Sequence, residues 1–462
     1  MIDEALAQRA LNAALESGAD FAELFFEDSE TTRIELTDGS VNEAAYARLC
    51  GAGIRVLYGT QSAYAYTSDP EEAKLLETAR AAAAAIRGGT PGRAGGFTQR
   101  AYATPMALPF SSVDNARRIA LIRDAARAAA DESGEVTQVV ASYMDKLQRV
   151  RIWNSEGLAV SDERPRTRCM LRAVAVAGGE AQTGHDGAGC CRGFEAYADS
   201  ADLEAAGRRA AKTAVTMLHA PECPAGRMPV VIDGGFGGVI FHEACGHSLE
   251  ATSVGRGNSE FCGKLGERIA APCVSAVDDG TLPGEWGSIN VDDEGAPPQR
   301  NLLIENGVLK GYLIDRLGAR RMGMPATGSA RRQGYGFAPT SRMTNTFICA
   351  GEDDEEEMLR TMGEGLFASR MGGGSVNPST GEFNFSVSEG YWVRDGRIAH
   401  PVRGATLIGR GGEVLKAIDR VGRRVWLEQG MCGSLSGSVP TNVGQPRIRV
   451  SILTVGGKGG AL

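Results

Sequence analysis

The sequence predicts an α+β fold in two parts. We expect residues 1–222 to form an N-terminal two-layer α/β region with antiparallel strands, and residues 223–462 to form a mostly β C-terminal domain. The C-terminal domain is expected to carry one short helix with two histidines. Three observations predict this fold. Helix-spaced and strand-like segments alternate in the first half, short apolar runs between glycine-rich turns fill the second, and three prolines between Pro221 and Pro229 mark a boundary. A chain of 462 residues is long enough for two cores.

In the N-terminal region, helical spacing of apolar residues predicts helices over Glu4–Ser17, Pro70–Ile86, Val113–Glu132 and Asp202–Leu218. We expect Asp69 to cap the second of them and Ser112 the third. Strand-like composition separated by turn residues predicts short strands over 21–26, 32–36, 44–49, 53–57, 62–66, 137–143, 147–153, 158–160 and 167–176. Residues 88–109 are rich in Gly, Pro, Thr and Arg without periodicity, so we interpret them as a linker.

In the C-terminal domain, Met228–Ile232 has the composition of a short buried strand, and the glycine-rich turn Asp233–Gly238 leads into a helix that begins near Val239. Because the turn lacks a nucleotide-binding pattern, we expect it to bring the helix close to the strand. Further strands are predicted over 302–304, 383–387 and 448–453, and a helix over 358–367.

The predicted helix contains Phe241-His-Glu-Ala-Cys-Gly-His247, which places two of the five histidines beside a carboxylate. Zinc peptidases bind their metal through such histidines and use the adjacent Glu as a general base, which here is Glu243. His242 and His247 are five residues apart, however, so a regular helix would point their rings about 140° apart. Shared ligation therefore requires a π-type bulge at Ala244–Gly246, where Gly246 would relax the backbone. The alternative is a buried helix with two hydrogen-bonded histidines.

A catalytic zinc site has three protein ligands and an open position, so a third ligand is required. Spacing alone leaves several candidates open: Glu250, Asp292, Asp293, Cys245, Cys262, Cys273, Cys349 and Cys432. Glycines flank the Met431-Cys432 pair and would allow its backbone to approach a buried centre closely.

Composition excludes several classes of protein. The formal net charge is −8 and no basic stripe interleaved with aromatic residues occurs, so we expect no nucleic-acid partner. The acidic N-terminus lacks the order of a signal peptide, and no apolar run approaches the roughly 20 residues that span a bilayer. We therefore expect a cytoplasmic protein without a membrane partner, in which the ten cysteines are thiols or metal ligands.

The C-terminal half resembles the TldD/PmbA family of peptidases, in particular the TldD-like members with a His-Glu-x-x-x-His motif. Beyond that motif, the resemblance rests on segments that occur in fixed order from about Met228 to the C-terminus: 262–267, 277–281, 292–295, 303–305, 311–313, 327–332, 342–346, 404–409, 431–433 and 454–457. The N-terminal half is similar only in its general layout.

The resemblance implies a metallopeptidase with one Zn²⁺ per chain, held by His242, His247 and Cys432, in which Glu243 activates a zinc-bound water. It also implies short or unfolded peptides as substrates, and assembly as a homodimer or as a heterodimer with a PmbA-like subunit. We further expect the flexible segment Gly372, Gly373, Gly374 and Ser375 to bind a peptide as an added strand, unless it is a simple hairpin loop.

Two other functions stay open from the sequence. One is a catalytically inactive or regulatory peptide-binding subunit, although such a protein would not need Glu243 beside both histidines. The other is a metal-dependent hydrolase that does not cleave peptides, which would use the same metal ligands. The sequence does not distinguish an endopeptidase from an exopeptidase.

Overall fold

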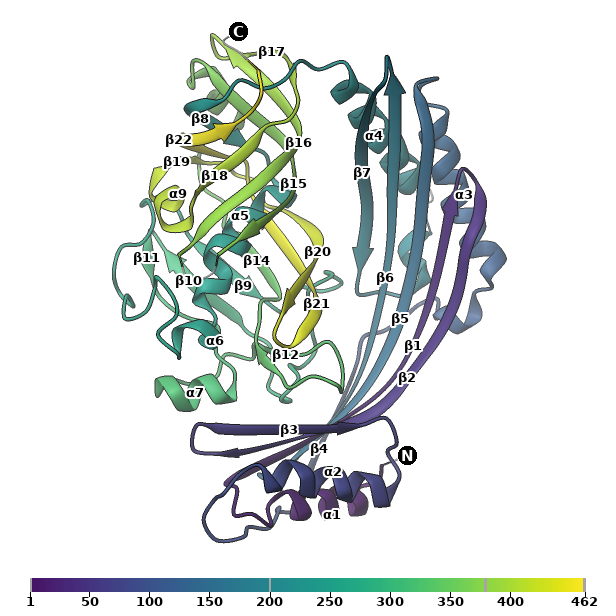
Figure 1. The fold of residues 1–462 in the computed structure, drawn as a ribbon, viewed down its shortest axis with the longest axis vertical. Coiled ribbons are helices and arrows are strands. Elements are labelled where there is room, and N and C mark those ends of the chain that lie inside the picture. The colour runs from purple at the N-terminus through teal and green to yellow at the C-terminus, as the bar shows by residue number, and fades with distance from the viewer. Residues whose placement is uncertain (1, 199–200, 378–379, 460–462) are drawn as a thin grey trace.

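One long, curved sheet forms the N-terminal part of the protein, and most of its strands run along the right side of Figure 1. The computed structural model describes residues 2–198, 201–377 and 380–459. The strand order is β3-β2-β1-β5-β6-β4, and β7 also pairs with β6. The strands are β1 Phe21–Thr37, β2 Ser40–Tyr58, β3 Gln61–Thr67, β4 Thr98–Ala103, β5 Val136–Asn154, β6 Leu158–Ala177 and β7 Glu180–Cys190.

These strands are much longer than the sequence suggests. β1 and β2 pair from Phe21↔Leu57 to Thr37↔Ser40, so each of them joins two of the predicted short strands. The gaps between the predicted strands, 27–31 in β1 and 50–52 in β2, contain mainly acidic or small residues, but the backbone pairing continues through both of them. The predicted linker 88–109 is also partly wrong, because Thr98–Ala103 forms β4, which pairs in parallel with β6.

Two pairs of helices pack on this sheet, one pair towards each end (Figure 1). The helices are α1 Glu4–Ala14, α2 Glu72–Ala84, α3 Asn115–Ala130 and α4 Ala201–Leu218. The two predicted caps are wrong. The side chain of Asp114, not that of Ser112, accepts the backbone N–H of Arg117 at the start of α3, and Glu71, not Asp69, occupies the cap position of α2.

The C-terminal part is built mainly of two sheets. One has the order β11-β10-β9-β14-β21-β20. In the other, β8, β15, β16, β18 and β22 pair in a closed ring, with β17 and β19 at its edges. The strands are β8 Gly226–Ile232, β9 Ala276–Asp279, β10 Arg300–Glu305, β11 Val308–Leu309, β12 Ala330–Arg331, β13 Thr340–Ser341, β14 Asn345–Ile348, β15 Gly365–Val376, β16 Glu382–Arg394, β17 Arg397–Val402, β18 Thr406–Arg410, β19 Ile418–Val421, β20 Trp426–Ser434, β21 Gly437–Gln445 and β22 Ile448–Gly456.

The helices of this part are short. They are α5 Val239–Phe241, α6 Ala251–Val254, α7 Arg316–Met322, α8 Glu355–Arg360 and α9 Gly411–Ala417. The predicted helix over 358–367 is misplaced, because α8 ends at Arg360 and Phe367 belongs to β15. Single turns lie at η1 Phe110–Ser112, η2 Phe194–Tyr197, η3 Gly235–Gly238, η4 His242–Gly246 and η5 His247–Leu249.

Buried ion pairs join the two parts. Arg164 of β6 donates to Asp293 Oδ1 at 2.6 Å, and both side chains are less than 10% exposed. Arg332 pairs with Glu23 of β1 in the same way. Because removing one partner of a buried pair leaves an uncompensated charge, these contacts fix the relative position of the two parts.

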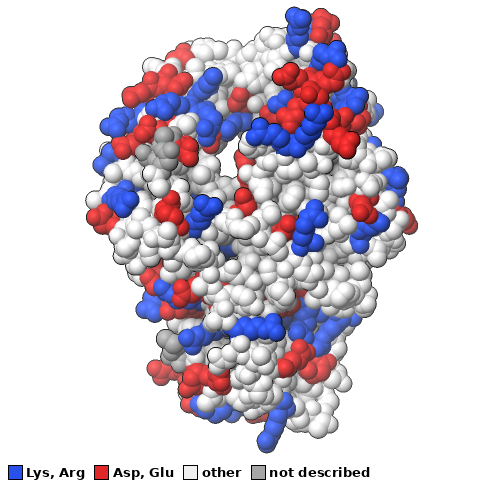
Figure 2. Space-filling view, turned by 180° about the vertical axis from the view of Figure 1, so that it is seen from behind, with Lys and Arg blue, Asp and Glu red and all other residues white. Residues whose placement is uncertain are grey.

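The molecular surface carries charges of both signs. Figure 2 shows Lys and Arg interspersed with Asp and Glu over the face that it presents. Among the described residues, no helix combines the length and the apolar character needed to cross a bilayer.

Candidate metal centre

The turn between β8 and α5 brings the histidine-bearing segment against the β20–β21 hairpin. A Cβ atom on Gly238 would lie 2.4 Å from the carbonyl oxygen of Gly444 in β21, so only glycine permits this approach. Asp233, directly after β8, pairs with Arg447 at 2.9 Å. The glycine-rich turn thus packs closely against β21. A Cβ atom on Gly237 would also lie 2.9 Å from Cγ2 of Ile232 in β8, the strand for which the close approach was expected.

The backbone between the two histidines forms a π-helical turn, η4. The N–H of His247 donates to the carbonyl of His242, five residues earlier, and the widened turn covers His242–Gly246. The ring centroids of the two histidines are 5.2 Å apart. The prediction of a bulge at Ala244–Gly246 is therefore confirmed.

The reason for glycine at position 246 differs from the predicted one. Gly246 has φ −56° and ψ −52°, which any residue adopts, so the turn does not need glycine's conformational freedom. A Cβ atom there would instead lie 2.3 Å from Sδ of the buried Met343. Glycine is required for space.

Cys432, on β20, completes a cluster with the two histidines. Its Sγ lies 3.2 Å from Nε2 of His242 and 3.2 Å from Nε2 of His247. The three atoms all lie within 4.8 Å of one another, and all three residues are buried. One ion can therefore contact two imidazoles and one thiolate at this place.

Glu250 occupies the other side of His247. Its Oε2 lies 3.2 Å from Nδ1 of His247, so the carboxylate can fix the tautomer that leaves Nε2 free as a ligand atom. Glu250 is one of the candidate third ligands from the sequence, but it lies outside the three-residue cluster and takes this orienting position beside His247.

Arg342 connects Glu250 to the hairpin, and the sequence analysis assigned it no role. Its Nη2 donates to the carbonyl of Cys432, and its Nη1 donates to the carbonyl of Gly437 at 2.9 Å. Its Nε lies 3.9 Å from Oε1 of Glu250. Nothing in the local sequence pattern indicates that Arg342 is fully buried. Its position in segment 342–346, which resembles the family, is the one feature of the sequence that could have indicated a role for it.

Electrostatics favour a thiolate in this cluster. Burial alone would raise the pKa of the Cys432 thiol, but His242 and His247 lower that pKa well below its usual value. Burial would likewise lower the pKa of His247, yet Glu250 and Cys432 raise it well above the ordinary range. Because a metal must displace protons from such ligands, metal affinity should decrease as pH falls.

Glu243 lies beside the cluster on its accessible side. Its Oε2 is 3.8 Å from Nε2 of His247, and its side chain is 30% exposed, against 3% for Glu250. A carboxylate that is close to the ligand atoms and still reaches solvent can exchange protons with a water molecule there.

The other candidate third ligands have different surroundings. Cys262 and Cys273 contact backbone carbonyls, Cys349 contacts Arg300, and Cys245 belongs to the apolar core. Asp292 accepts backbone N–H groups, and Asp293 pairs with Arg164. Within the described residues, none of them joins the cluster.

The predicted peptide-binding segment, Gly372 to Ser375, is a strand and not a hairpin loop. It belongs to β15, which pairs with β8 only over Leu366–Ala368 but continues along β16 to Val376. The part of β15 after Ala368 therefore has one edge to which no described strand is paired.

Sequence models of one family match most of the chain. The PmbA/TldA metallopeptidase domain 1 matches residues 22–86, the central domain matches 108–218 and the C-terminal domain matches 225–457. These matches include every residue of the cluster.

Whole proteins and solved structures are similar over nearly the full length. The Metalloprotease TldD homolog of Haemophilus influenzae is 35% identical, covering 95% of this chain and 93% of that protein. A metalloprotease of Methanothermobacter thermautotrophicus is 34% identical, covering 96% and 97%. A solved structure from Thermotoga maritima, 25% identical, covers 98% of this chain and 100% of its own with a TM-score of 0.80. The chain therefore belongs to the PmbA/TldD family of metallopeptidases.

Proposed function

We propose that this protein is a zinc-dependent peptidase that hydrolyses peptide bonds of short or unfolded peptides. The observation that carries the proposal is the convergence of two imidazole nitrogens and one sulfur, with Glu243 3.8 Å from His247. His242, His247 and Cys432 would hold one Zn²⁺ per chain.

The donor set fits zinc. Zinc is commonly bound by imidazole nitrogen and thiolate sulfur, and its catalytic sites have three protein ligands and one open position. The lowered pKa of Cys432, caused by the two histidines against the opposing effect of burial, supplies the thiolate. When bound, zinc polarises a peptide carbonyl and acidifies a water molecule in the open position.

The residues of the chain then have distinct tasks. Glu243 accepts a proton from the attacking water and delivers it to the leaving amine. Glu250 holds the His247 ring with Nε2 towards the cluster, and Arg342 links Glu250 to the backbone of Cys432. The π turn keeps both imidazoles on one side of the segment.

For substrate binding we propose the free edge of β15. An extended peptide could pair with the backbone of Gly372, Gly373, Gly374 and Ser375, which would recognise the main chain more than particular side chains. Met371, directly before them, packs in the same apolar core as Ala244 of the π turn. This arrangement suits unfolded peptides of varied sequence.

Cleavage of a mixed peptide library, read by mass spectrometry with and without a chelator, tests the proposal. We expect cleavage that is lost with chelator and restored by Zn²⁺. Glu243→Gln should retain zinc and lower the rate by at least roughly 100-fold, the usual scale for a general base. The exposed Glu305→Gln is the matched control and should cleave as the wild type does.

The same experiment separates the alternatives. Peptides that bind without being cut by the zinc-loaded wild type would indicate a peptide-binding subunit. Zinc loading without any cleavage or binding of peptides would favour a metal-dependent hydrolase with another substrate. Either result would contradict the proposal.

We also propose that the protein acts in the cytoplasm as a homodimer or as a heterodimer with a PmbA-like subunit. Light scattering after size exclusion, with the chain alone and with such a subunit added, measures the assembly. A strictly monomeric chain under both conditions would contradict this part.

A further inference from the structure

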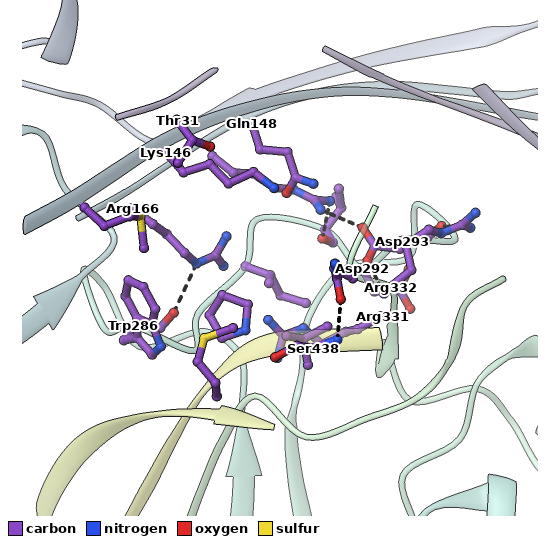
Figure 3. A pocket seen from close by; sticks show the side chains of 18 of the residues that line it. Thr31, Lys146, Gln148, Arg166, Trp286, Asp292, Asp293, Arg331, Arg332 and Ser438 are labelled. Atoms are coloured by element: carbon purple, nitrogen blue, oxygen red, sulfur yellow. Dashed lines mark hydrogen bonds and ion pairs between the residues drawn. The ribbon is translucent and has the colours of Figure 1, made fainter. Parts of the chain in front are cut away.

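A cavity separate from the metal centre lies between the concave face of the N-terminal sheet and the β20–β21 hairpin (Figure 3). Its volume is about 330 Å³. Met431 lines this cavity, whereas Cys432, the next residue of β20, contacts the two histidines. Since successive side chains of a strand point to opposite faces, the hairpin separates the cavity from the metal centre.

The wall of the cavity carries an unusual excess of positive charge. Six of its side chains are cationic and two are anionic; these are Arg33, Lys146, Arg164, Arg166, Arg331 and Arg332, against Asp292 and Asp293. Lys146 on β5 and Arg166 on β6 are directly opposite each other in the strand register. Like charges in that relation destabilise a sheet unless a carboxylate lies beside each of them. Glu27 lies 3.4 Å from Nζ of Lys146 and offsets that charge, whereas no described carboxylate pairs with Arg166. Arg332 pairs with Glu23, and Arg164 pairs with Asp162 and Asp293.

Two of the guanidinium groups have only neutral partners. Arg166 donates to the carbonyls of Trp286 at 3.2 Å and Ser288 at 3.0 Å. Arg331 donates to the carbonyl of Met343 at 2.6 Å and to the Thr441 hydroxyl. Among the described residues neither forms an ion pair, although Arg166 is 7% and Arg331 4% exposed. A buried charge of this kind normally has a counter-ion.

The two carboxylates of the wall are already engaged. Asp293 accepts from Arg164 at 2.6 Å and from the backbone N–H of Arg332 at 2.7 Å. Asp292 accepts three backbone N–H groups. Burial, with the neighbouring charge of Arg166, lowers the pKa of Arg331 to about 9. Of the buried arginines in the wall, Arg166 and Arg331 therefore have no paired carboxylate among the described residues, whereas Arg164 and Arg332 have one, as does the half-buried Lys146.

The rest of the wall is mixed: Thr31, Gln148, Gln333 and Ser438 are polar, and the apolar part is formed by Met144, Trp286, Ile289, Val291, Met431, Val439 and Pro440. Guanidinium groups bind carboxylate and phosphate through paired hydrogen bonds. We propose that this cavity binds a small oxyanion, a phosphate or carboxylate group with at most a short apolar body, held by Arg166 and Arg331. The proposal does not depend on peptidase activity.

Isothermal titration calorimetry with inorganic phosphate, N-acetyl-leucine and N-acetyl-leucinamide tests it. We expect phosphate or N-acetyl-leucine to bind and the uncharged amide not to bind. Preference for phosphate would identify a free phosphate group as the ligand, and preference for N-acetyl-leucine would identify the carboxyl end of a peptide. Heat from neither anion, or equal binding of the amide, would overturn the proposal.

Variants locate the bound anion. Arg166→Gln removes one of the two charges and should weaken binding by at least about tenfold, the scale of one charge-assisted hydrogen bond. Thr31→Glu places a carboxylate opposite Lys146 in the same wall and should weaken binding similarly, because it competes for the same cations. Thr31→Gln, of equal size without charge, is the matched control and should bind as the wild type does.

The metal centre could also bind phosphate, so the titrations are repeated after chelator treatment. Binding that persists without metal and is lost in Arg166→Gln and Thr31→Glu supports the cavity. Binding that disappears on chelation, or that is unchanged in both variants, places the anion elsewhere and overturns the proposal.

Discussion

Replacing Glu250 should weaken zinc binding without removing any ligand atom. The Glu250 carboxylate is 3% exposed and lies 3.2 Å from Nδ1 of His247. Glu250→Ala leaves that buried N–H without an acceptor, which costs about 1–3 kcal/mol, and frees the imidazole to turn. Partners of this kind typically contribute 10–100-fold to metal affinity. We therefore expect a zinc dissociation constant raised about 100-fold.

Glu250→Gln gives an intermediate case. The amide oxygen can still accept from Nδ1, but the bond loses its charge, and neutral hydrogen bonds are weaker by about 1 kcal/mol. That difference corresponds to roughly fivefold to tenfold in affinity. The order of zinc affinity should be wild type, then Glu250→Gln, then Glu250→Ala.

Competition with a fluorescent zinc chelator at constant pH measures these affinities. Glu243→Gln is the control within the same site, because Glu243 faces the open side and should change zinc affinity little. Thermal unfolding of each variant with and without zinc shows whether the fold is retained. Wild-type zinc affinity in a folded Glu250→Ala would refute the orienting role of Glu250.

Two further predictions concern packing and pH. Gly246→Ala places a methyl group 2.3 Å from Sδ of Met343, so we expect the free energy of unfolding to fall by about 1–3 kcal/mol and zinc binding to be impaired. The control Gly134→Ala adds a methyl group in open space and should have little effect. Equal stabilities of the two variants would contradict the steric argument. Burial and the charge of Glu294 raise the pKa of Asp315 from 3.8 to about 6 in the folded protein. The folded state therefore binds this proton more tightly than the unfolded state, which contributes up to about 3 kcal/mol to the free energy of unfolding at low pH. This contribution is lost as pH rises from about 4 to 6. Asp315→Asn, which keeps the helix cap, should flatten the pH dependence of unfolding in that window and be more stable than the wild type at pH 7; an unchanged profile would exclude Asp315 as its source.

Local chemistry made part of the metal centre predictable. The five-residue separation of His242 and His247 on a 3.6-residue helix requires a widened turn, and the structure has it at the predicted place. Cys432 is different, because it lies 185 residues beyond His247 and only the pairing of β20 with β21 determines which face it presents. No local pattern contains that information, so the resemblance to a family was needed to choose it.

Other features depend on tertiary contacts. Residues 27–31 of β1 and 50–52 of β2 lie between the predicted short strands, and they are extended because the backbones of β1 and β2 pair through them. The steric need for Gly246 arises from Met343, almost a hundred positions away in the chain. The opposition of Lys146 and Arg166 likewise follows from the register of a long hairpin. Such relations can be read only from the folded chain.

X-ray absorption at the zinc edge of the metal-loaded protein tests the central claim most directly. Ligation by His242, His247 and Cys432 predicts sulfur and imidazole nitrogen from the protein in a ratio of about one to two, with about one zinc per chain. Cys432→Ser should lose the sulfur signal and bind zinc more weakly. A spectrum without sulfur, or undiminished zinc in Cys432→Ser, would contradict the metal centre described above.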